Sequence, residues 1–264
     1  MESNTVERFE YQDSRYYWKD GIAYPSVTTI LSAYPKPYLA EWRGNLGNEE
    51  ANKQAREAAD KGSFVHNAFH QAITRGTPIK WHTASTADPY RDIVVDEQFA
   101  FMSLYKLQQW FEVVKPEIIL TEQQVFSDKF EFAGTVDLLL KIKGGVYQVN
   151  GSTPLKLTEG IYIADIKTGK YVGEEAKLQL AAYARALNEN NPDLDILGGL
   201  ILHTQSQNRK GIQGMGTTLI HDLDVKFYDF IKVHELWKLY NTTRPEPLEL
   251  PAILNFNHVS FTKQ

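Results

Sequence analysis

The sequence predicts an α/β protein in which helices pack against a mixed central sheet, with a mostly helical part at the N-terminus. Three observations support this prediction. Residues 1–115 have helical composition, residues 116–168 form short apolar runs separated by turn residues, and residues 174–241 alternate between helical and strand patterns. An αβ sandwich, with the sheet carried by residues 116–240, fits this order of elements best.

Three helical segments are expected before residue 116. A short apolar turn follows Ser26 and Thr28, and residues 48–73 have the Ala, Glu, Lys and Gln content of a helix that is interrupted near Gly62. Residues 88–114 carry a long apolar stripe, with Asp88 as N-cap and Pro89 as first helical residue. This third helix should face the core.

After Pro116 the pattern changes to short runs rich in Ile, Val, Leu, Phe and Tyr, which are typical of strands. A helix is expected from residue 174 to about Asn191, where Pro192 follows, and another at 225–241. The expected strands span residues 117–127, 130–142, 145–149, 160–168, 196–204 and 216–223.

Composition limits the possible functions of this chain of 264 residues, which is 42% hydrophobic and 23% charged. Its polar, acidic N-terminus lacks the apolar core of a signal peptide, and no run of about 18 apolar residues occurs. We therefore expect a cytoplasmic protein that does not span a membrane. A net charge of −5 argues against a protein that coats nucleic acid nonspecifically, but a local groove can still be basic.

The chain contains no cysteine, which excludes disulfides, thiolate zinc sites, iron–sulfur clusters and a cysteine nucleophile. Oxygen atoms and imidazole nitrogens remain as metal ligands. This donor chemistry favours a hard cation such as Mg²⁺ or Mn²⁺.

Two predicted strands carry acidic residues among apolar neighbours: Asp137 in "FAGTVDLLLKI" and Asp165 in "IYIADIKTGK". A buried carboxylate needs a cation, a metal or hydrogen-bond donors to offset its lost hydration. Asp165 and Lys167 share one strand face, while Ile166 turns to the core with its carbonyl free to reach a metal. With Asp137 close by, this predicts an oxygen-rich Mg²⁺ site. The alternative is a structural ion pair between Lys167 and one of the aspartates.

Several motifs occur in an order that resembles the PD-(D/E)XK nuclease superfamily. They are "GTVD" ending at Asp137, "DIK" at 165–167, Gln179 and Tyr183 in "QLAAY", His66 in "KGSFVH", and the upstream "YPSVTTIL" and "EWRGNLG". "DxK" alone is a weak signal, but the ordered set is specific. The likeness is strongest to the RecB-type and mitochondrial genome maintenance exonuclease branch, with its phage relatives.

This resemblance implies a restriction-endonuclease-like fold, with residues 1–264 as one nuclease domain. It also implies site roles. Asp137, Asp165, the Ile166 carbonyl and His66 would hold the metal, and Lys167 would orient or deprotonate the attacking water. Glu122 would be a further ligand or would position water, and Gln179 and Tyr183 would contact a phosphate or Lys167. The alternatives are an exposed strand residue for Glu122, a core residue for Tyr183, and an interior or boundary residue for His66. The missing cysteines distinguish the chain from the relatives that carry an iron–sulfur cluster.

Three classes of function follow from these patterns. The leading one is a Mg²⁺- or Mn²⁺-dependent exonuclease that acts on DNA ends, with single-stranded DNA as the expected substrate, in replication, repair or recombination. The second is a structure- or sequence-specific endonuclease, because the site does not encode which phosphodiester reaches it. The third is a nucleic-acid-binding protein without turnover.

Contacts to nucleic acid are expected from two loops. Arg209 and Lys210 lie in a polar loop with nearby glycines, and Lys170 and Tyr171 follow the "DIK" strand directly. Aromatic residues between Tyr24 and Trp42 could stack on unpaired bases, or they could pack in the protein interior.

Overall fold

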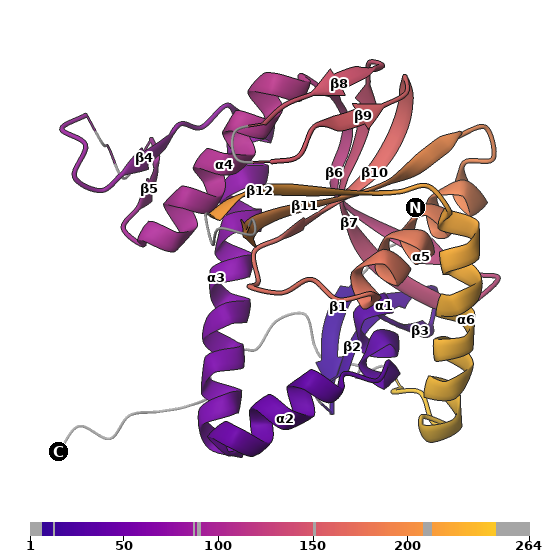
Figure 1. Cartoon of the computed structure of the whole chain (residues 1–264). Helices are drawn as coiled ribbons and strands as arrows, with labels where there is room; N and C mark the ends of the chain where they lie inside the picture. Colours follow the sequence, from indigo (N-terminus) through magenta and orange to yellow (C-terminus); the bar gives the residue numbers. More distant parts are fainter. Residues whose placement is uncertain are drawn as a thin grey trace, which may run out of the picture.

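A mixed five-stranded sheet forms the centre of the protein in the computed structural model (Figure 1), which describes residues 7–12, 14–86, 88, 91–149, 152–207 and 213–246. Strands β10 and β11 pair in parallel, whereas the other neighbours are antiparallel. The predicted α/β class is thus confirmed. The order of strands is β12 (Gln213–Ile220), β11 (Ile196–Gln207), β10 (Gly160–Lys167), β7 (Phe132–Ile142) and β6 (Glu117–Ser127).

Helices α1 (Val27–Ile30), α5 (Glu175–Asn190) and α6 (Leu223–Tyr240) cover one face of this sheet (Figure 1). Their apolar side chains form one buried cluster with Leu139 and Ile163 of the sheet. Because successive strand residues point to opposite faces, Leu139 packs on this side while its neighbours pack on the other.

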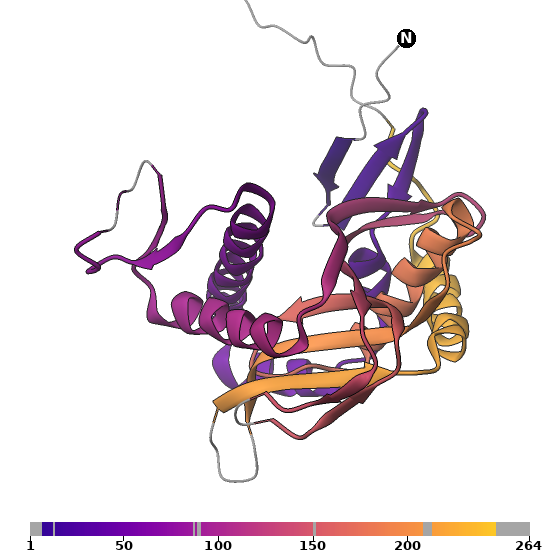
Figure 2. The ribbon, with the colours of Figure 1, turned by 90° about the horizontal axis from the view of Figure 1, so that it is seen from above.

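Helices α3 (Asn48–Arg75) and α4 (Gln98–Val114) cover the opposite face, as the view from above also shows (Figure 2). Leu138 and Leu140 of β7 form the second buried cluster there, together with Trp110 of α4. The buried stripe of α4 confirms that this helix faces the core. None of the helices in the described part of the chain is both long and apolar enough to cross a bilayer.

The N-terminal part is less helical than predicted, because β1 (Glu7–Tyr11), β2 (Ser14–Lys19) and β3 (Ile22–Pro25) form an antiparallel sheet. The two-residue turn between β2 and β3 consists of Asp20 and Gly21, with φ of 51° and 78°. An Asp-Gly pair between two strand-like runs is a recognisable hairpin signal. Asp20-Gly21 is therefore the feature of the sequence that could have predicted this sheet.

Helix α3 is continuous through Gly62, where an interruption was expected. A Cβ atom at this glycine would lie 3.1 Å from Thr168 Oγ1, so the small residue allows the helix to approach the loop after β10 closely. Helix α4 begins at Gln98, nine residues later than the expected start at Pro89. Glu97 rather than Asp88 caps it, its side chain accepting a 2.7 Å hydrogen bond from the Ala100 N–H.

The remaining elements are short. Helix α2 (Pro37–Leu46) precedes α3, and the 3₁₀ turn η1 (Leu31–Ala33) follows α1. Two small pairings complete the described fold, the parallel pair β4 (Ile79–Trp81) and β5 (Ile93–Val95) and the antiparallel pair β8 (Gly145–Tyr147) and β9 (Leu155–Leu157). Strand β5 accounts for the late start of α4, and β9 lies in a segment expected to be a turn.

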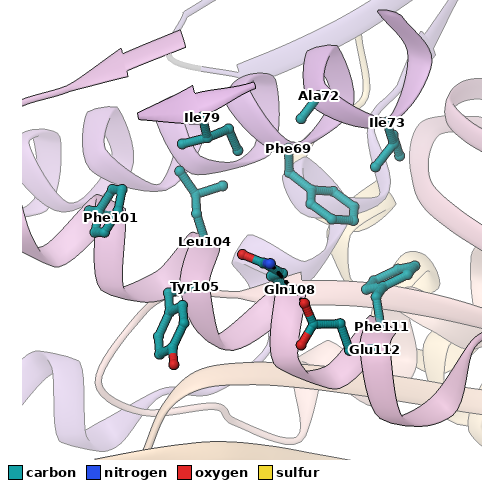
Figure 3. Close-up of a pocket in the computed structure, with 10 residues that line it drawn as sticks. All are labelled: Phe69, Ala72, Ile73, Ile79, Phe101, Leu104, Tyr105, Gln108, Phe111 and Glu112. Atoms are coloured by element: carbon teal, nitrogen blue, oxygen red, sulfur yellow. Dashed lines mark hydrogen bonds between the residues drawn. The ribbon is translucent and has the colours of Figure 1, made fainter. Parts of the chain in front are cut away.

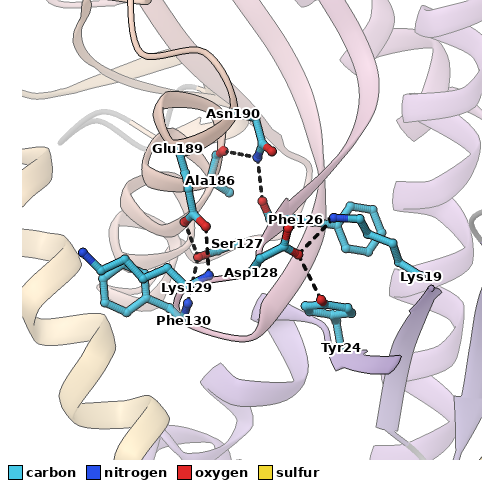
Figure 4. Close-up of polar contacts among 10 residues, drawn as sticks. All are labelled: Lys19, Tyr24, Phe126, Ser127, Asp128, Lys129, Phe130, Ala186, Glu189 and Asn190. Carbon is cyan, nitrogen blue, oxygen red and sulfur yellow. Dashed lines mark hydrogen bonds and ion pairs between the residues drawn. The ribbon is translucent and has the colours of Figure 1, made fainter. Parts of the chain in front are cut away.

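The turn between β6 and β7 is held from two sides by polar contacts (Figure 4). On one side, Glu189 of α5 accepts hydrogen bonds from Ser127 Oγ (2.6 Å) and the Lys129 N–H (2.8 Å). On the other, Lys19 and Tyr24 of the N-terminal sheet contact the Asp128 carboxylate at 2.9 Å. These contacts fix both the N-terminal sheet and α5 relative to the β6–β7 hairpin.

His234 lies within the aromatic core of α6, only 2% exposed and near Phe132, Phe230 and Trp237. Burial, and next the positive charge of Lys238, lower the pKa of His234 to about 4. The unfolded chain, with a histidine pKa of about 6.5, therefore binds a proton that the folded protein excludes. We expect the free energy of unfolding to fall by about 3 kcal/mol as the pH decreases from 6.5 to 4.

The measurement is urea unfolding at a series of pH values. His234→Leu should reduce this pH dependence, whereas His221→Leu at an exposed position should leave it in place. An unchanged pH profile for His234→Leu would contradict the assignment.

Candidate functional site

A pocket of about 270 Å³ brings together five of the eight residues predicted for catalysis and metal binding. Its walls come from β1, β2, α1, α3, β6, β7 and α5, so residues from widely separated parts of the chain meet there. Asp165 and Lys167 do not line the pocket, but both form hydrogen bonds with the side chain of Gln179, which does line it. The predicted residues that line it are His66, Glu122, Asp137, Gln179 and Tyr183.

His66, Glu122 and Asp137 form a group of three donors whose ligand atoms all lie within 4.8 Å of one another. His66 Nδ1 is 3.6 Å from Glu122 Oε1 and 3.4 Å from Asp137 Oδ2. Ligands about 2.1 Å from an octahedral ion lie roughly 3.0 Å apart in adjacent positions, so the observed separations suit a bound cation after small adjustments. Two carboxylates and one imidazole match the donor chemistry expected from a chain without cysteine.

The backbone of Ile166 orients two of these donors. Its carbonyl can only accept, so His66 Nε2 carries the proton in their 3.0 Å hydrogen bond and Nδ1 faces the carboxylates. The Ile166 N–H donates to Asp137 Oδ2 at 2.8 Å. Metal-binding histidines typically donate their second ring N–H to such a carbonyl. The Ile166 carbonyl, which was expected to be a direct ligand, supports the imidazole through this hydrogen bond, and its role as a metal ligand stays a prediction.

Glu122 has a left-handed backbone conformation, with φ of 49°, inside strand β6. A residue other than glycine in this region costs on the order of 1–3 kcal/mol, and such conformations concentrate at functional sites. The β6–β7 pairing registers Thr121 with Leu138 and Gln123 with Val136, which places Glu122 beside Asp137. The irregular backbone thus occurs at the residue that completes the donor group.

Asp165, Lys167, Gln179 and Tyr183 form a connected network next to this group. Lys167 Nζ lies 2.8 Å from Asp165 Oδ2 and donates to Gln179 Oε1 at 3.0 Å. The amide nitrogen of Gln179 donates to Asp165 Oδ1 at 3.1 Å and to the Tyr183 hydroxyl at 3.3 Å. Asp165 and Lys167 therefore share one strand face, and Gln179 and Tyr183 share one helix face, both as predicted. The structural ion pair and the catalytic interpretation are both compatible with these contacts.

Burial and mutual charge perturb the pKa values in the site. Burial raises the pKa of Asp137 to about 7, while the His66 charge opposes this rise and Asp165 adds to it. Burial lowers the pKa of His66, but the carboxylates of Asp137 and Glu122 outweigh it and raise the pKa to about 9. Burial likewise opposes the charged form of Lys167, yet Asp165 and Asp137 raise its pKa overall. Such clusters of shifted groups are a feature of functional sites.

Gly134, the first residue of "GTVD", lies directly beneath the Tyr183 ring. A Cβ atom at this glycine would be 2.2 Å from Tyr183 Cε1. We expect Gly134→Ala to lower the free energy of unfolding by about 1–3 kcal/mol, because the ring or the strand must move. Urea unfolding would measure this change.

The matched control is Gly44→Ala in helix α2, where nothing lies within 4 Å of the added methyl group. That substitution should raise stability by about 0.5–1 kcal/mol, as is usual for glycine in a helix. Equal effects of the two substitutions would contradict the close approach of Tyr183 to Gly134.

The residues predicted to bind nucleic acid lie outside the pocket or outside the described residues. Lys170 and Tyr171 are exposed on the loop after β10, with Lys170 Nζ 5.5 Å from the Tyr171 ring centre. Arg209 and Lys210 fall outside the described residues. Of the aromatic residues suggested for base stacking, Tyr24 is buried and bonded to Asp128, whereas Tyr38 is 47% exposed.

Arg8 and Arg15 line the same pocket from the N-terminal sheet, although the sequence did not indicate them as site residues. No local pattern singles them out, since that sheet was itself not predicted.

A larger pocket of about 560 Å³ lies between α3, β4 and α4 (Figure 3). It is lined mainly by apolar side chains such as Phe69, Ile79 and Phe111, and its polar residues Gln108 and Glu112 bond to each other at 2.8 Å. Among the described residues that line it there is no group of metal-binding or nucleophilic side chains, so we place the candidate site in the smaller pocket.

No model of a known protein family matches the sequence, and no curated protein matches it either. The geometry of the pocket is therefore the basis for the functional assignment.

Proposed function

We propose that this protein is a metal-dependent deoxyribonuclease that hydrolyses phosphodiester bonds from strand ends, with single-stranded DNA as its substrate. The observation that carries the proposal is the donor group of His66, Glu122 and Asp137 beside the Asp165–Lys167–Gln179 network. This combination, on a mixed sheet flanked by helices, is what a restriction-endonuclease-like fold of the PD-(D/E)XK superfamily would provide.

His66, Glu122 and Asp137 would hold the ion, with Asp165 as a further donor once its contacts to Lys167 and Gln179 rearrange. Two or three carboxylates favour Mg²⁺ or Mn²⁺, and the imidazole makes Mn²⁺ the better fit of the two. The ion supplies a bound water of lowered pKa and charge that stabilises the phosphate in the transition state.

The side chains of this protein would orient the reactants. Lys167 keeps its positive charge because the neighbouring aspartates raise its pKa. Its ammonium can therefore donate to the attacking water or to a phosphate oxygen. Gln179 holds the Lys167 amine and the Asp165 carboxylate at fixed positions, and Tyr183 holds Gln179 in turn.

The shape of the site favours a single strand over a duplex. The pocket of about 270 Å³ is bounded by the N-terminal sheet on one side and by α3 and α5 on others. A confined pocket admits one strand more easily than two, and a strand that must be threaded requires a free end. This is the physical basis for preferring an exonuclease.

The decisive experiment compares three DNA substrates of matched sequence, namely a linear single strand, a circular single strand and a blunt duplex. Each is end- or internally labelled and incubated with Mg²⁺, Mn²⁺ or EDTA. We expect cleavage of the linear strand only, and only with a metal.

The other outcomes are distinct. Rapid cleavage of the circle would assign an endonuclease, and preference for the blunt duplex would keep the exonuclease but remove the threading argument. Binding without cleavage under all metal conditions would favour a non-catalytic nucleic-acid-binding protein.

A further inference from the structure

Two arginines of the N-terminal sheet line the wall of the candidate site pocket that the sheet forms. In the β1–β2 pairing, Arg8 lies opposite Tyr17 and Glu10 lies opposite Arg15. Residues directly opposite one another, and residues two apart along a strand, share one face of a sheet. Arg8 and Arg15 thus lie on the same face, and Tyr17 from that face bonds to Thr135 of β7 at 2.9 Å.

Neither guanidinium forms an ion pair with any other residue in the described part of the chain. The Nε atom of Arg15 is also buried without a hydrogen-bond partner. A buried unsatisfied donor is costly, and a ligand in the adjoining pocket would offset this cost.

The backbone of Arg15 is held rigidly, which makes its position well defined. Its N–H donates to Thr29 Oγ1 at 2.8 Å, and its carbonyl accepts from the Ser26 N–H at 2.8 Å and from Thr29 Oγ1 at 3.0 Å. The free guanidinium is therefore presented from a fixed point, so little conformational freedom of the backbone is lost on binding.

We propose that Arg8 and Arg15 form a phosphate-binding subsite. It would hold the DNA backbone phosphate adjacent to the phosphate that lies at the donor group of His66, Glu122 and Asp137. This inference rests on the proposed function. One pocket is lined both by the donor group of His66, Glu122 and Asp137 and by the two arginines, which suits a ligand that carries one phosphate for the donor group and a second phosphate for the arginines. The planar guanidinium binds phosphate oxygens through two parallel hydrogen bonds. Contacts of this kind position a strand without reading its sequence.

The test measures binding of a fluorescent single-stranded oligonucleotide in EDTA, at several salt concentrations. We expect Arg8→Gln and Arg15→Gln each to weaken binding about tenfold. Each should also reduce the slope of the logarithm of the binding constant against the logarithm of the salt concentration by about one. The control Arg75→Gln removes the same charge at the exposed end of α3 and should bind like the parent protein. Melting temperatures identify a variant that fails to fold, and Arg8 is exposed, so its substitution remains informative.

A second set of oligonucleotides carries one uncharged methylphosphonate linkage, moved along the strand. When the uncharged linkage replaces the phosphate that Arg15 binds, Arg15→Gln should no longer weaken binding, because that phosphate charge has already been removed. A constant penalty at every linkage, or binding by both variants equal to that of the parent, would overturn the inference.

Cleavage with Mn²⁺ is measured separately, so the two proposals fail independently. If the parent cleaves DNA and both variants bind normally, the nuclease assignment stands and the subsite is wrong. If the parent binds through these arginines but does not cleave, the subsite stands and the nuclease assignment is wrong.

Discussion

Replacing Asp137 by asparagine is expected to abolish metal-dependent DNA cleavage, with a loss of about a thousandfold or more. Asp137 belongs to the donor group, and its Oδ2 atom lies 3.4 Å from His66 Nδ1. Asparagine keeps the shape and can still accept the hydrogen bond from the Ile166 N–H, so the fold should be preserved. It removes the ligand charge, and the several kcal/mol of transition-state stabilisation from a bound metal would be lost with it.

The measurement is digestion of end-labelled single-stranded DNA with Mn²⁺, combined with calorimetric titration of Mn²⁺. Asp165→Asn should have a comparable effect on cleavage. Asp193→Asn, at an exposed position after α5, is the matched control and should cleave normally. Unchanged cleavage in EDTA, or by Asp137→Asn, would show that no metal at this site is needed.

Replacing Lys167 by alanine should lower the cleavage rate by about two orders of magnitude or more while Mn²⁺ binding persists. That is the scale expected for the loss of an electrostatic or proton-transfer group. Lys167 lies 2.8 Å from Asp165 Oδ2 but is absent from the group of three donors, so binding and rate should respond differently.

Removal of Lys167 also leaves the buried Asp165 carboxylate without its cation, which can destabilise a protein by about 3–5 kcal/mol. Lys167→Arg keeps the positive charge but places it differently relative to Asp165. It serves as a second variant if Lys167→Ala does not fold. Lys177→Ala, which removes an amine bound to Glu174 at the start of α5, is the control. A Lys167→Ala enzyme with the parent rate would identify the Asp165–Lys167 contact as a structural ion pair.

Features that depend on near neighbours in the chain could be predicted from the sequence. Strand β6 begins and ends at the predicted residues, Glu117 and Ser127, because its apolar run is bounded by clear turn signals. Periods of two and of 3.6 residues also placed Asp165 beside Lys167 and Gln179 beside Tyr183. The start of α4 was misplaced because Ile93–Val95 form the short strand β5, a tertiary pairing that overrides the helical pattern.

The ordered motifs predicted that distant residues share one site, but the geometry of that site follows from the tertiary structure. His66, Glu122 and Asp137 come from α3, β6 and β7, and no periodicity relates a helix residue to two strands that follow it much later in the chain. The left-handed φ of Glu122 depends on packing around the site rather than on its own preference. Arg8 and Arg15 join the pocket because the N-terminal sheet is bound to the β6–β7 hairpin, through Lys19 and Tyr24 at Asp128 and through Tyr17 at Thr135. Local sequence preferences define the elements, whereas the distances between their side chains follow from which apolar faces pack together.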